Sequence, residues 1–85
     1  MRNVAFSPIA FQEYNEWFEI NIQLINRIKT LIHDIDRDPF KGIGKPEPLK
    51  GNWAGFWSRR IDQEHRLIYK VSDNQILIVK CKGHY

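Results

Sequence analysis

The sequence has little of several features that would mark particular protein classes. Cys81 is its only cysteine, so an intrachain disulfide is impossible and an oxidising compartment is not indicated. No hydrophobic run approaches the roughly 20 residues that span a bilayer. Gln12 and Glu13 interrupt the N-terminal segment early, which argues against the core of a signal peptide. We therefore expect a cytoplasmic protein without membrane contact.

Motifs for metal or nucleotide binding are also missing. His33, His65 and His84 are scattered, and no paired cysteine or histidine spacing is present. The glycine- and lysine-containing stretch 42–47 lacks the ending and the following helix of a P-loop. Cys81 lies in the run ILIVKCK, which predicts a strand residue rather than a catalytic thiolate. We expect no metal and no cofactor.

What is present is the composition of one small folded domain. Apolar residues make up 42% and charged residues 27% of 85 residues, which predicts a single domain over 1–85 with a modest core. The net charge of +3 is unevenly distributed. Residues 1–38 carry four basic and six acidic side chains, whereas residues 39–85 carry nine and four. The basic second half is suited to holding a polyanion.

Two helices are predicted in the first half, after a short strand over residues 2–6. Ser7-Pro8 is a helix start signal, with serine as N-cap and proline at the first helical position. The apolar stripe expected on this helix consists of Ile9, Phe11, Tyr14, Trp17 and Phe18. Asn21 is a plausible cap for the second helix, which closes at Asp38-Pro39. Its expected buried face consists of Ile25, Ile28, Leu31 or Ile32, and Ile35.

Three strands are predicted in the second half, after an ordered loop over residues 40–55. They are Phe56–Ile61, Arg66–Val71 and Gln75–Lys80, rich in aromatic and β-branched residues and separated by polar turns. The order strand, helix, helix and three strands predicts an α+β fold. We expect the helices to pack as a hairpin on one face of a mainly antiparallel sheet.

Arginines in the first two predicted strands are candidates for phosphate binding. Alternation along the strands places Arg60 and Arg66 on one face of the sheet, with Arg59 on the other. Two guanidinium groups close together match the geometry of a phosphate. A solvated outer face, with Asp62 or Glu64 paired to an arginine, explains the pattern equally well.

Two further groups are candidates for proton transfer. Glu47 lies between two prolines that stiffen its backbone, close to Lys45 and Lys50, so it is either a general base or a surface glutamate in a turn. His84 follows the last strand closely, and an imidazole can give a proton to a leaving alkoxide. Tyr85 adds a ring for stacking a base. A frayed tail is the alternative for both residues.

Four separated motifs carry a resemblance to a known family. GKPEPLK, GFWSRRI, EHRLIY and the terminal HY resemble the YoeB (Txe) family of toxins, within the wider RelE-like fold. The resemblance extends over almost the whole chain, in length and in the order of elements. It implies an mRNA interferase that cuts messenger RNA in the aminoacyl site of the 70S ribosome. It also implies neutralisation by a YefM-like antitoxin, and a homodimer or a toxin–antitoxin hetero-oligomer.

The resemblance assigns roles to individual residues. Glu47 would take the proton from a 2′-hydroxyl, Arg66 would stabilise charge on the phosphate, and His84 would protonate the departing 5′ oxygen. The product would be a 2′,3′-cyclic phosphate, with Tyr85 positioning or stacking the substrate. The predicted RNA and phosphate contacts are Lys45, Lys50, Arg59, Arg60 and Glu64. The stretch 81–83 differs from the bulkier, aromatic-containing pattern of the family.

Two other functions compete with the nuclease. The first is a non-catalytic RelE-like module that binds RNA, or binds an antitoxin and acts with it as a transcriptional corepressor. The second is a free-standing enzyme for small nucleotides, for which the chain is too small to enclose the ligand. Convergence of Glu47, Arg66 and His84 on one phosphate-sized volume would favour the nuclease.

Overall fold

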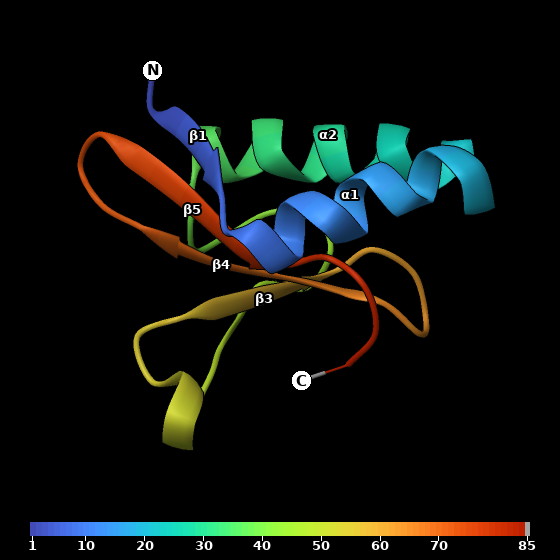
Figure 1. The fold of residues 1–85 in the computed structure, drawn as a ribbon. Coiled ribbons are helices and arrows are strands. Elements are labelled where there is room, and N and C mark those ends of the chain that lie inside the picture. The colour runs from blue at the N-terminus through green and yellow to red at the C-terminus, as the bar shows by residue number, and fades with distance from the viewer. Residues whose placement is uncertain (85) are drawn as a thin grey trace.

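The computed structural model of the protein describes residues 1–84, and Figure 1 shows its fold. The elements follow in the predicted order of strand, helices and strands. They are β1 (Asn3–Phe6), α1 (Pro8–Ile20), α2 (Ile22–Arg37), β2 (Glu47–Pro48), the short 3-10 helix Gly51–Trp53, β3 (Trp57–Arg60), β4 (Arg66–Val71) and β5 (Gln75–Lys80). The predicted boundaries of β4 and β5 are confirmed, and β3 is one residue shorter at each end.

The helices begin and end where their capping residues predict. The side chain of Ser7 accepts the Ala10 N–H at 3.1 Å, with Pro8 at the first helical position. Asn21 interrupts the helical backbone and accepts the Gln23 N–H at 3.1 Å, so α2 starts one residue later. The extended Asp38 ends α2 directly before Pro39.

Within residues 1–84, the strands form one sheet in the order β1-β5-β4-β3-β2. The β3–β4–β5 meander and the β2–β3 pair are antiparallel, whereas β1 runs parallel to β5. Both helices lie on the same face of this sheet (Figure 1). The predicted α+β class is thereby confirmed, and the parallel edge strand was not foreseen.

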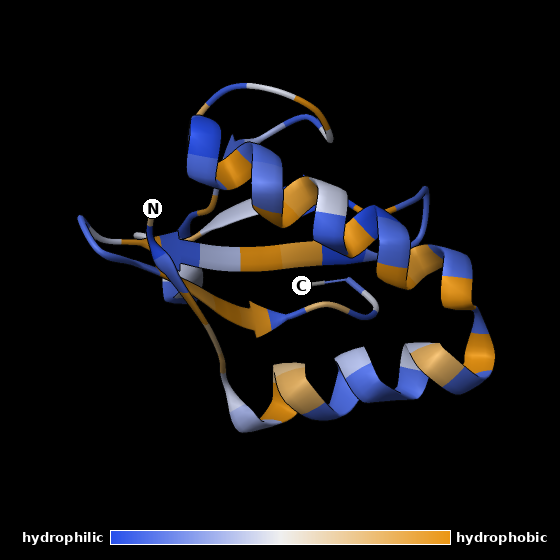
Figure 2. Cartoon of the chain, turned by 90° about the horizontal axis from the view of Figure 1, so that it is seen from above, coloured by the Kyte–Doolittle hydropathy of each residue, from blue (hydrophilic) through white to orange (hydrophobic). Residues whose placement is uncertain are grey.

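The core lies between the helices and the sheet. Figure 2, seen from the helix side, shows hydrophobic residues along the central strands. The buried positions of α2 are Ile25, Ile28, Leu31 and Ile35, as predicted. They pack with Leu67, Tyr69, Ile76 and Ile78 of the sheet.

The apolar stripe predicted for α1 is only partly buried. Trp17 is 2% exposed, whereas Ile9, Phe11 and Phe18 are 65%, 57% and 48% exposed. The reason is that α1 packs mainly against α2, β5 and β1, which cover one narrow side of the helix. The other apolar side of α1 stays open to solvent. No helix within residues 1–84 is long and apolar enough to cross a membrane.

Candidate active site

The strand register places three predicted site residues on the face of the sheet away from the helices. Glu47 pairs with Ser58, and Arg60 pairs with Arg66. Paired residues point to the same face, and residues two apart on one strand share it. Glu47, Arg60 and Arg66 therefore share a face, while Tyr69 belongs to the core on the helix side. The prediction that Arg60 and Arg66 share a face is confirmed.

Two arginines pair at one end of this face, and the exposed Lys70 lies on it at the other end of β4. Ser58 and Ile68, which pair with each other farther along the same strands, are 3% and 0% exposed. The expected solvated basic face is thus interrupted by buried residues in its middle. Arg60 is exposed, and Arg66 is half-buried.

The guanidinium of Arg66 is held by backbone oxygens and not by a carboxylate. Its Nη1 donates to the carbonyl oxygens of Asp62, Gln63 and His65 at 2.9, 3.2 and 3.1 Å. Neither Asp62 nor Glu64 forms an ion pair with an arginine within residues 1–84, so the pairing that was the alternative explanation does not occur there. Carbonyl oxygens orient the guanidinium and leave its positive charge in place for an anion.

Asp62 instead shapes the turn between β3 and β4. Its Oδ1 accepts the backbone N–H groups of Glu64 and His65 at 2.9 and 2.7 Å. Burial raises the pKa of Asp62, but these hydrogen bonds and the nearby Arg66 guanidinium lower it more, so the net shift is downward. An ionised Asp62 therefore fixes the turn that leads into β4, which begins at Arg66.

Glu47 lies on the exposed edge strand β2, at the end of a tightly packed loop. Gly44 accepts the Arg60 N–H at 2.7 Å. Gly44 has a φ of +78°, and a Cβ there would also lie 2.8 Å from Leu31 Cδ2 and 3.2 Å from the Arg60 carbonyl oxygen, so the position favours glycine. Lys45 follows with φ of 53°, a left-handed conformation that costs a non-glycine residue free energy. The surrounding contacts thus hold the backbone that leads to Glu47.

The position of Arg59 contradicts the prediction that it contacts phosphate. Its side chain points to the helix side of the sheet and is 0% exposed. Its five N–H groups donate to the Tyr69 hydroxyl, the Asp34 carboxylate and the carbonyl oxygens of Asp38, Lys41 and Ile43. Because every donor already has an acceptor, Arg59 has none left for RNA. Arg59 is therefore a structural residue of β3 that holds the 38–46 loop.

Asp34 and Tyr69 complete this buried network. Asp34 accepts the Ile43 N–H at 3.0 Å, and the Tyr69 hydroxyl donates to the Pro39 carbonyl at 2.7 Å. Hydrogen bonds from Arg37 and then Arg59 hold the pKa of Asp34 well below its ordinary value, although burial opposes the shift. Burial raises the pKa of Tyr69, so its hydroxyl stays protonated and can donate.

The segment after β5, residues 81–84, is also held in place and is called the tail below. Glu13 accepts the Cys81 N–H at 2.8 Å, and the Trp17 indole donates to the Cys81 carbonyl at 2.9 Å. The Arg66 N–H donates to the Gly83 carbonyl at 3.0 Å. The tail curves from β5 past the sheet to the side away from the helices (Figure 1). These contacts hold the residue before His84 beside the first residue of β4.

The remaining predicted site residues are exposed, except one that lies outside residues 1–84. Lys45, Lys50, Glu64 and His84 are exposed, so each is accessible to a ligand. Tyr85 lies outside the described residues.

Cys81 is buried directly after β5. Burial raises the pKa of its thiol to about 12, so the thiol stays protonated and is not a thiolate. The prediction that Cys81 is a strand residue is wrong by one position, because β5 ends at Lys80.

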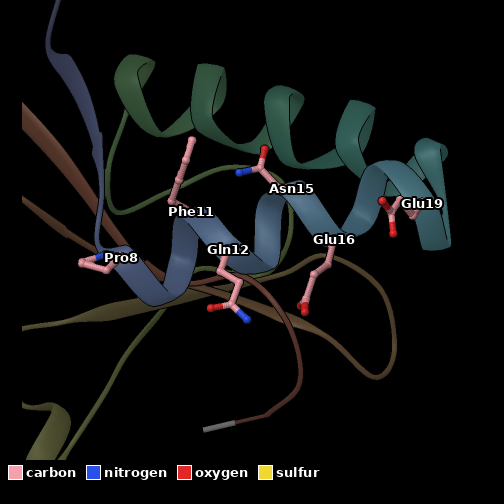
Figure 3. A pocket seen from close by; sticks show the side chains of 6 residues that line it. All are labelled: Pro8, Phe11, Gln12, Asn15, Glu16 and Glu19. Carbon is pink, nitrogen blue, oxygen red and sulfur yellow. The ribbon is translucent and has the colours of Figure 1, made fainter.

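A pocket elsewhere on the molecule has no part in this arrangement. It is lined by residues of α1, namely Pro8, Phe11, Gln12, Asn15, Glu16 and Glu19. Figure 3 shows Phe11 directed toward α2, while Gln12 and Glu16 point the other way. Its polar groups do not converge on one point, and none of the predicted site residues lines it.

The residues that position the site were missed by the sequence reasoning. Asp34, Glu13 and Trp17 carry no motif, and they lie in helices far along the chain from Arg59 and Cys81, which they hold. Carboxylates on a helix surface usually face solvent, so no local pattern indicated that Glu13 and Asp34 accept backbone N–H groups.

The fold and the charged face define a class of small α+β proteins with two helices on one side of a sheet and a basic site on the other. A family model described as "YoeB-like toxin of bacterial type II toxin-antitoxin system" matches residues 6–85. The chain belongs to this family and is the toxin component of a toxin–antitoxin system.

Individual relatives agree with this assignment. "Toxin YoeB" of Streptomyces coelicolor is 51% identical over 82 residues, which cover 96% of this chain and 98% of the relative. The YoeB dimer from Staphylococcus aureus has a TM-score of 0.93 and 47% identity, covering 99% and 98% of the two chains. The heterotetrameric YoeB-YefM complex from Staphylococcus aureus matches with a TM-score of 0.91 and 46% identity, covering 100% and 99%.

Proposed function

We propose that this protein is an endoribonuclease that cuts messenger RNA in the aminoacyl site of the ribosome. One observation carries the proposal. Glu47, Arg60 and Arg66 share the face of the sheet away from the helices, and the hydrogen bond from Arg66 to Gly83 holds the residue before His84 beside Arg66. An acid–base pair and two cations on one accessible surface suit the cleavage of a phosphodiester. Membership of the YoeB-like toxin family supports the same reaction.

The proposed reaction uses two proton transfers and no cofactor. The Glu47 carboxylate takes the proton from the 2′-hydroxyl of the RNA, and the 2′ oxygen attacks the adjacent phosphorus. The bond from phosphorus to the 5′ oxygen breaks, and His84 gives that oxygen a proton. The products are a 2′,3′-cyclic phosphate and a 5′-hydroxyl end. Tyr85 would position or stack the substrate.

Cations stabilise the charge that develops on the phosphate in this reaction. Arg66 is oriented by three carbonyl oxygens, so it is prepared before the substrate arrives. Its Nε and Nη2 make no hydrogen bond to residues 1–84, which leaves a two-donor edge for phosphate. Arg60, Lys45 and Lys50 are exposed and would bind neighbouring phosphates, with Glu64 beside them.

The test is primer extension on messenger RNA in a purified translating ribosome system. Wild type should produce new 5′ ends at the aminoacyl site. His84→Ala should lower the cleavage rate by about 10²–10⁴, and Arg66→Ala by about 10²–10³. Glu47→Gln should also lose activity because the amide cannot take the proton.

His33→Ala is the matched control for these variants, because His33 is an exposed histidine on α2, away from the site. It should cleave like wild type. Uncut messenger RNA despite ribosome binding by wild type would contradict the enzymatic proposal and favour a binding module that acts as a corepressor. Because the proposed target is the translating ribosome, the protein would act in the cytoplasm.

A YefM-like antitoxin is the proposed partner of this chain. The support is the solved YoeB-YefM complex from Staphylococcus aureus, which this chain matches over its full length. A dimer of this chain is proposed on the likeness to the YoeB dimer of the same organism. Light scattering of the purified protein, with and without a co-expressed YefM-like antitoxin, should give a dimer and a larger hetero-oligomer. A monomer in both samples would contradict both assemblies.

A further inference from the structure

The tail that carries His84 is held by a side chain with no role in the proposed chemistry. The Gly83 N–H donates to His65 Nδ1 at 2.7 Å, while the Gly83 carbonyl accepts the Arg66 N–H at 3.0 Å. Both backbone polar groups of Gly83 are therefore bound by consecutive residues of the turn and of β4. Gly83 directly precedes His84, so this clamp sets the direction in which His84 leaves the sheet.

His65 is itself fixed from two sides. Its ring meets Trp17 of α1 edge-on, with centroids 4.7 Å apart and an angle of 79°. Its side chain is 15% exposed, and its backbone N–H donates to Asp62 Oδ1 at 2.7 Å. A rigid ring offers its Nδ1 lone pair in one direction. His65 thus differs from the exposed His33 and His84.

The hydrogen bond requires one form of the His65 ring. A backbone N–H can only donate, so Nδ1 must carry no proton and the neutral ring must carry its hydrogen on Nε2. Glu64 Oε2 lies 3.8 Å from Nε2, on the outer side of the ring. A doubly protonated ring would present a donor to the Gly83 N–H and break the clamp.

The backbone of Gly83 is shaped for this contact. Its φ is +79°, in the left-handed region that favours glycine. A Cβ at this position would meet only Lys80 Nζ, at 4.0 Å, so space is not the reason for glycine. The left-handed turn directs the Gly83 N–H toward His65 and its carbonyl toward Arg66.

We propose that His65 is a positioning residue, which fixes His84 by accepting the Gly83 N–H. The effect of this positioning on cleavage rests on the proposed nuclease function. The placement of His84 itself does not, because it is a property of the free protein. Geometry of this kind matters for catalysis, since a displaced acid loses much of its effect on the rate.

Three variants separate the acceptor from simple packing. His65→Phe keeps an aromatic ring against Trp17 and removes the acceptor. His65→Asn restores an acceptor, because its side-chain oxygen is as far along the side chain as Nδ1. His33→Phe is the matched control, a histidine lost from an exposed position on α2. Circular dichroism and thermal unfolding establish that each variant is folded.

The first readout is NMR on the free full-length protein. Wild type should show a coupling across the hydrogen bond between the Gly83 amide nitrogen and His65 Nδ1, and a rigid His84 amide by the heteronuclear NOE. His65→Phe should accelerate exchange of the Gly83 amide about tenfold, as expected for the loss of one hydrogen bond, and should mobilise His84. His65→Asn should restore the protection of the Gly83 amide from exchange and the rigidity of His84. His33→Phe should resemble wild type.

The second readout is single-turnover cleavage on the ribosome. His65→Phe should slow cleavage about tenfold at unchanged ribosome affinity, and His65→Asn should recover most of the rate. An unchanged Gly83 amide in His65→Phe, a missing coupling in wild type, or an equally rigid His84 without the acceptor would overturn the proposal. Failure of the nuclease function would appear separately, as wild type that does not cut, while the NMR result would still decide the role of His65.

Discussion

The 38–46 loop and the 81–84 tail carry the two candidate proton-transfer groups into the site, and they are held by different interactions. The loop before Glu47 is bound by a fully buried guanidinium that donates to a carboxylate and three carbonyl oxygens. The tail before His84 is held by single hydrogen bonds to Glu13, Trp17, His65 and Arg66. A buried charge cannot lose its partners without a large cost, whereas a single hydrogen bond can open. The loop is therefore expected to contribute more to the stability of the fold than the tail does.

The largest effect on stability is expected from Arg59→Met, which removes the buried guanidinium that binds the loop. This guanidinium donates to Asp34 and to three loop carbonyls, and we expect a loss of about 3–5 kcal/mol in the free energy of unfolding, measured in urea. Arg37→Met is the matched control, because Arg37 pairs with the same carboxylate at 2.9 Å from an exposed position. It should cost only a small part of that loss, because solvent screens an exposed ion pair. Equal losses would show that burial of Arg59 has no special importance.

Removal of one hydroxyl tests the same network more gently. Tyr69→Phe deprives the Pro39 carbonyl of its donor and Arg59 Nε of its acceptor, and should cost about 1–3 kcal/mol in thermal or urea unfolding. Tyr14→Phe provides the comparison, since the Tyr14 hydroxyl makes no hydrogen bond within residues 1–84. A Tyr69→Phe variant as stable as Tyr14→Phe would contradict the role given to this hydroxyl.

The pH dependence of unfolding should identify the contribution of Asp34. Its folded pKa is held below the ordinary 3.8, chiefly by the hydrogen bond from Arg37. The unfolded chain binds the proton first as pH falls, so the stabilisation is complete above about pH 5 and is lost progressively below it. Asp34→Asn should flatten the stability profile between about pH 5 and pH 2. Parallel profiles for the two proteins would exclude this linkage.

The smallest effect is expected at the ion pair on the tail. Lys82 and Glu16 meet at 3.3 Å with side chains 35% and 40% exposed. Glu16→Gln should change the free energy of unfolding by less than about 0.5 kcal/mol and leave the Gly83 amide protected. A larger loss, abolished by high salt, would mean that this pair anchors the tail electrostatically.

Much of the fold could be predicted from local patterns. Ser7 and Asn21 marked the helix starts, the spacing of isoleucines marked the buried side of α2, and alternation placed Arg60 and Arg66 together. These features depend on neighbours in sequence, where helix and strand periods apply directly. The stripe on α1 was predicted less well, because burial of a helix side depends on what packs against it.

The sequence by itself determined the order of elements, the family and the set of candidate groups. Only the tertiary structure decided between adjacent arginines of one strand: Arg59 is enclosed, and Arg60 is exposed at the site. Alternation requires that they face opposite sides and does not say which side can hold a charge. That depended on Asp34, 25 residues earlier, and on loop carbonyls that converge on the same place. A buried guanidinium needs partners brought from distant parts of the chain, and only the folded backbone supplies them.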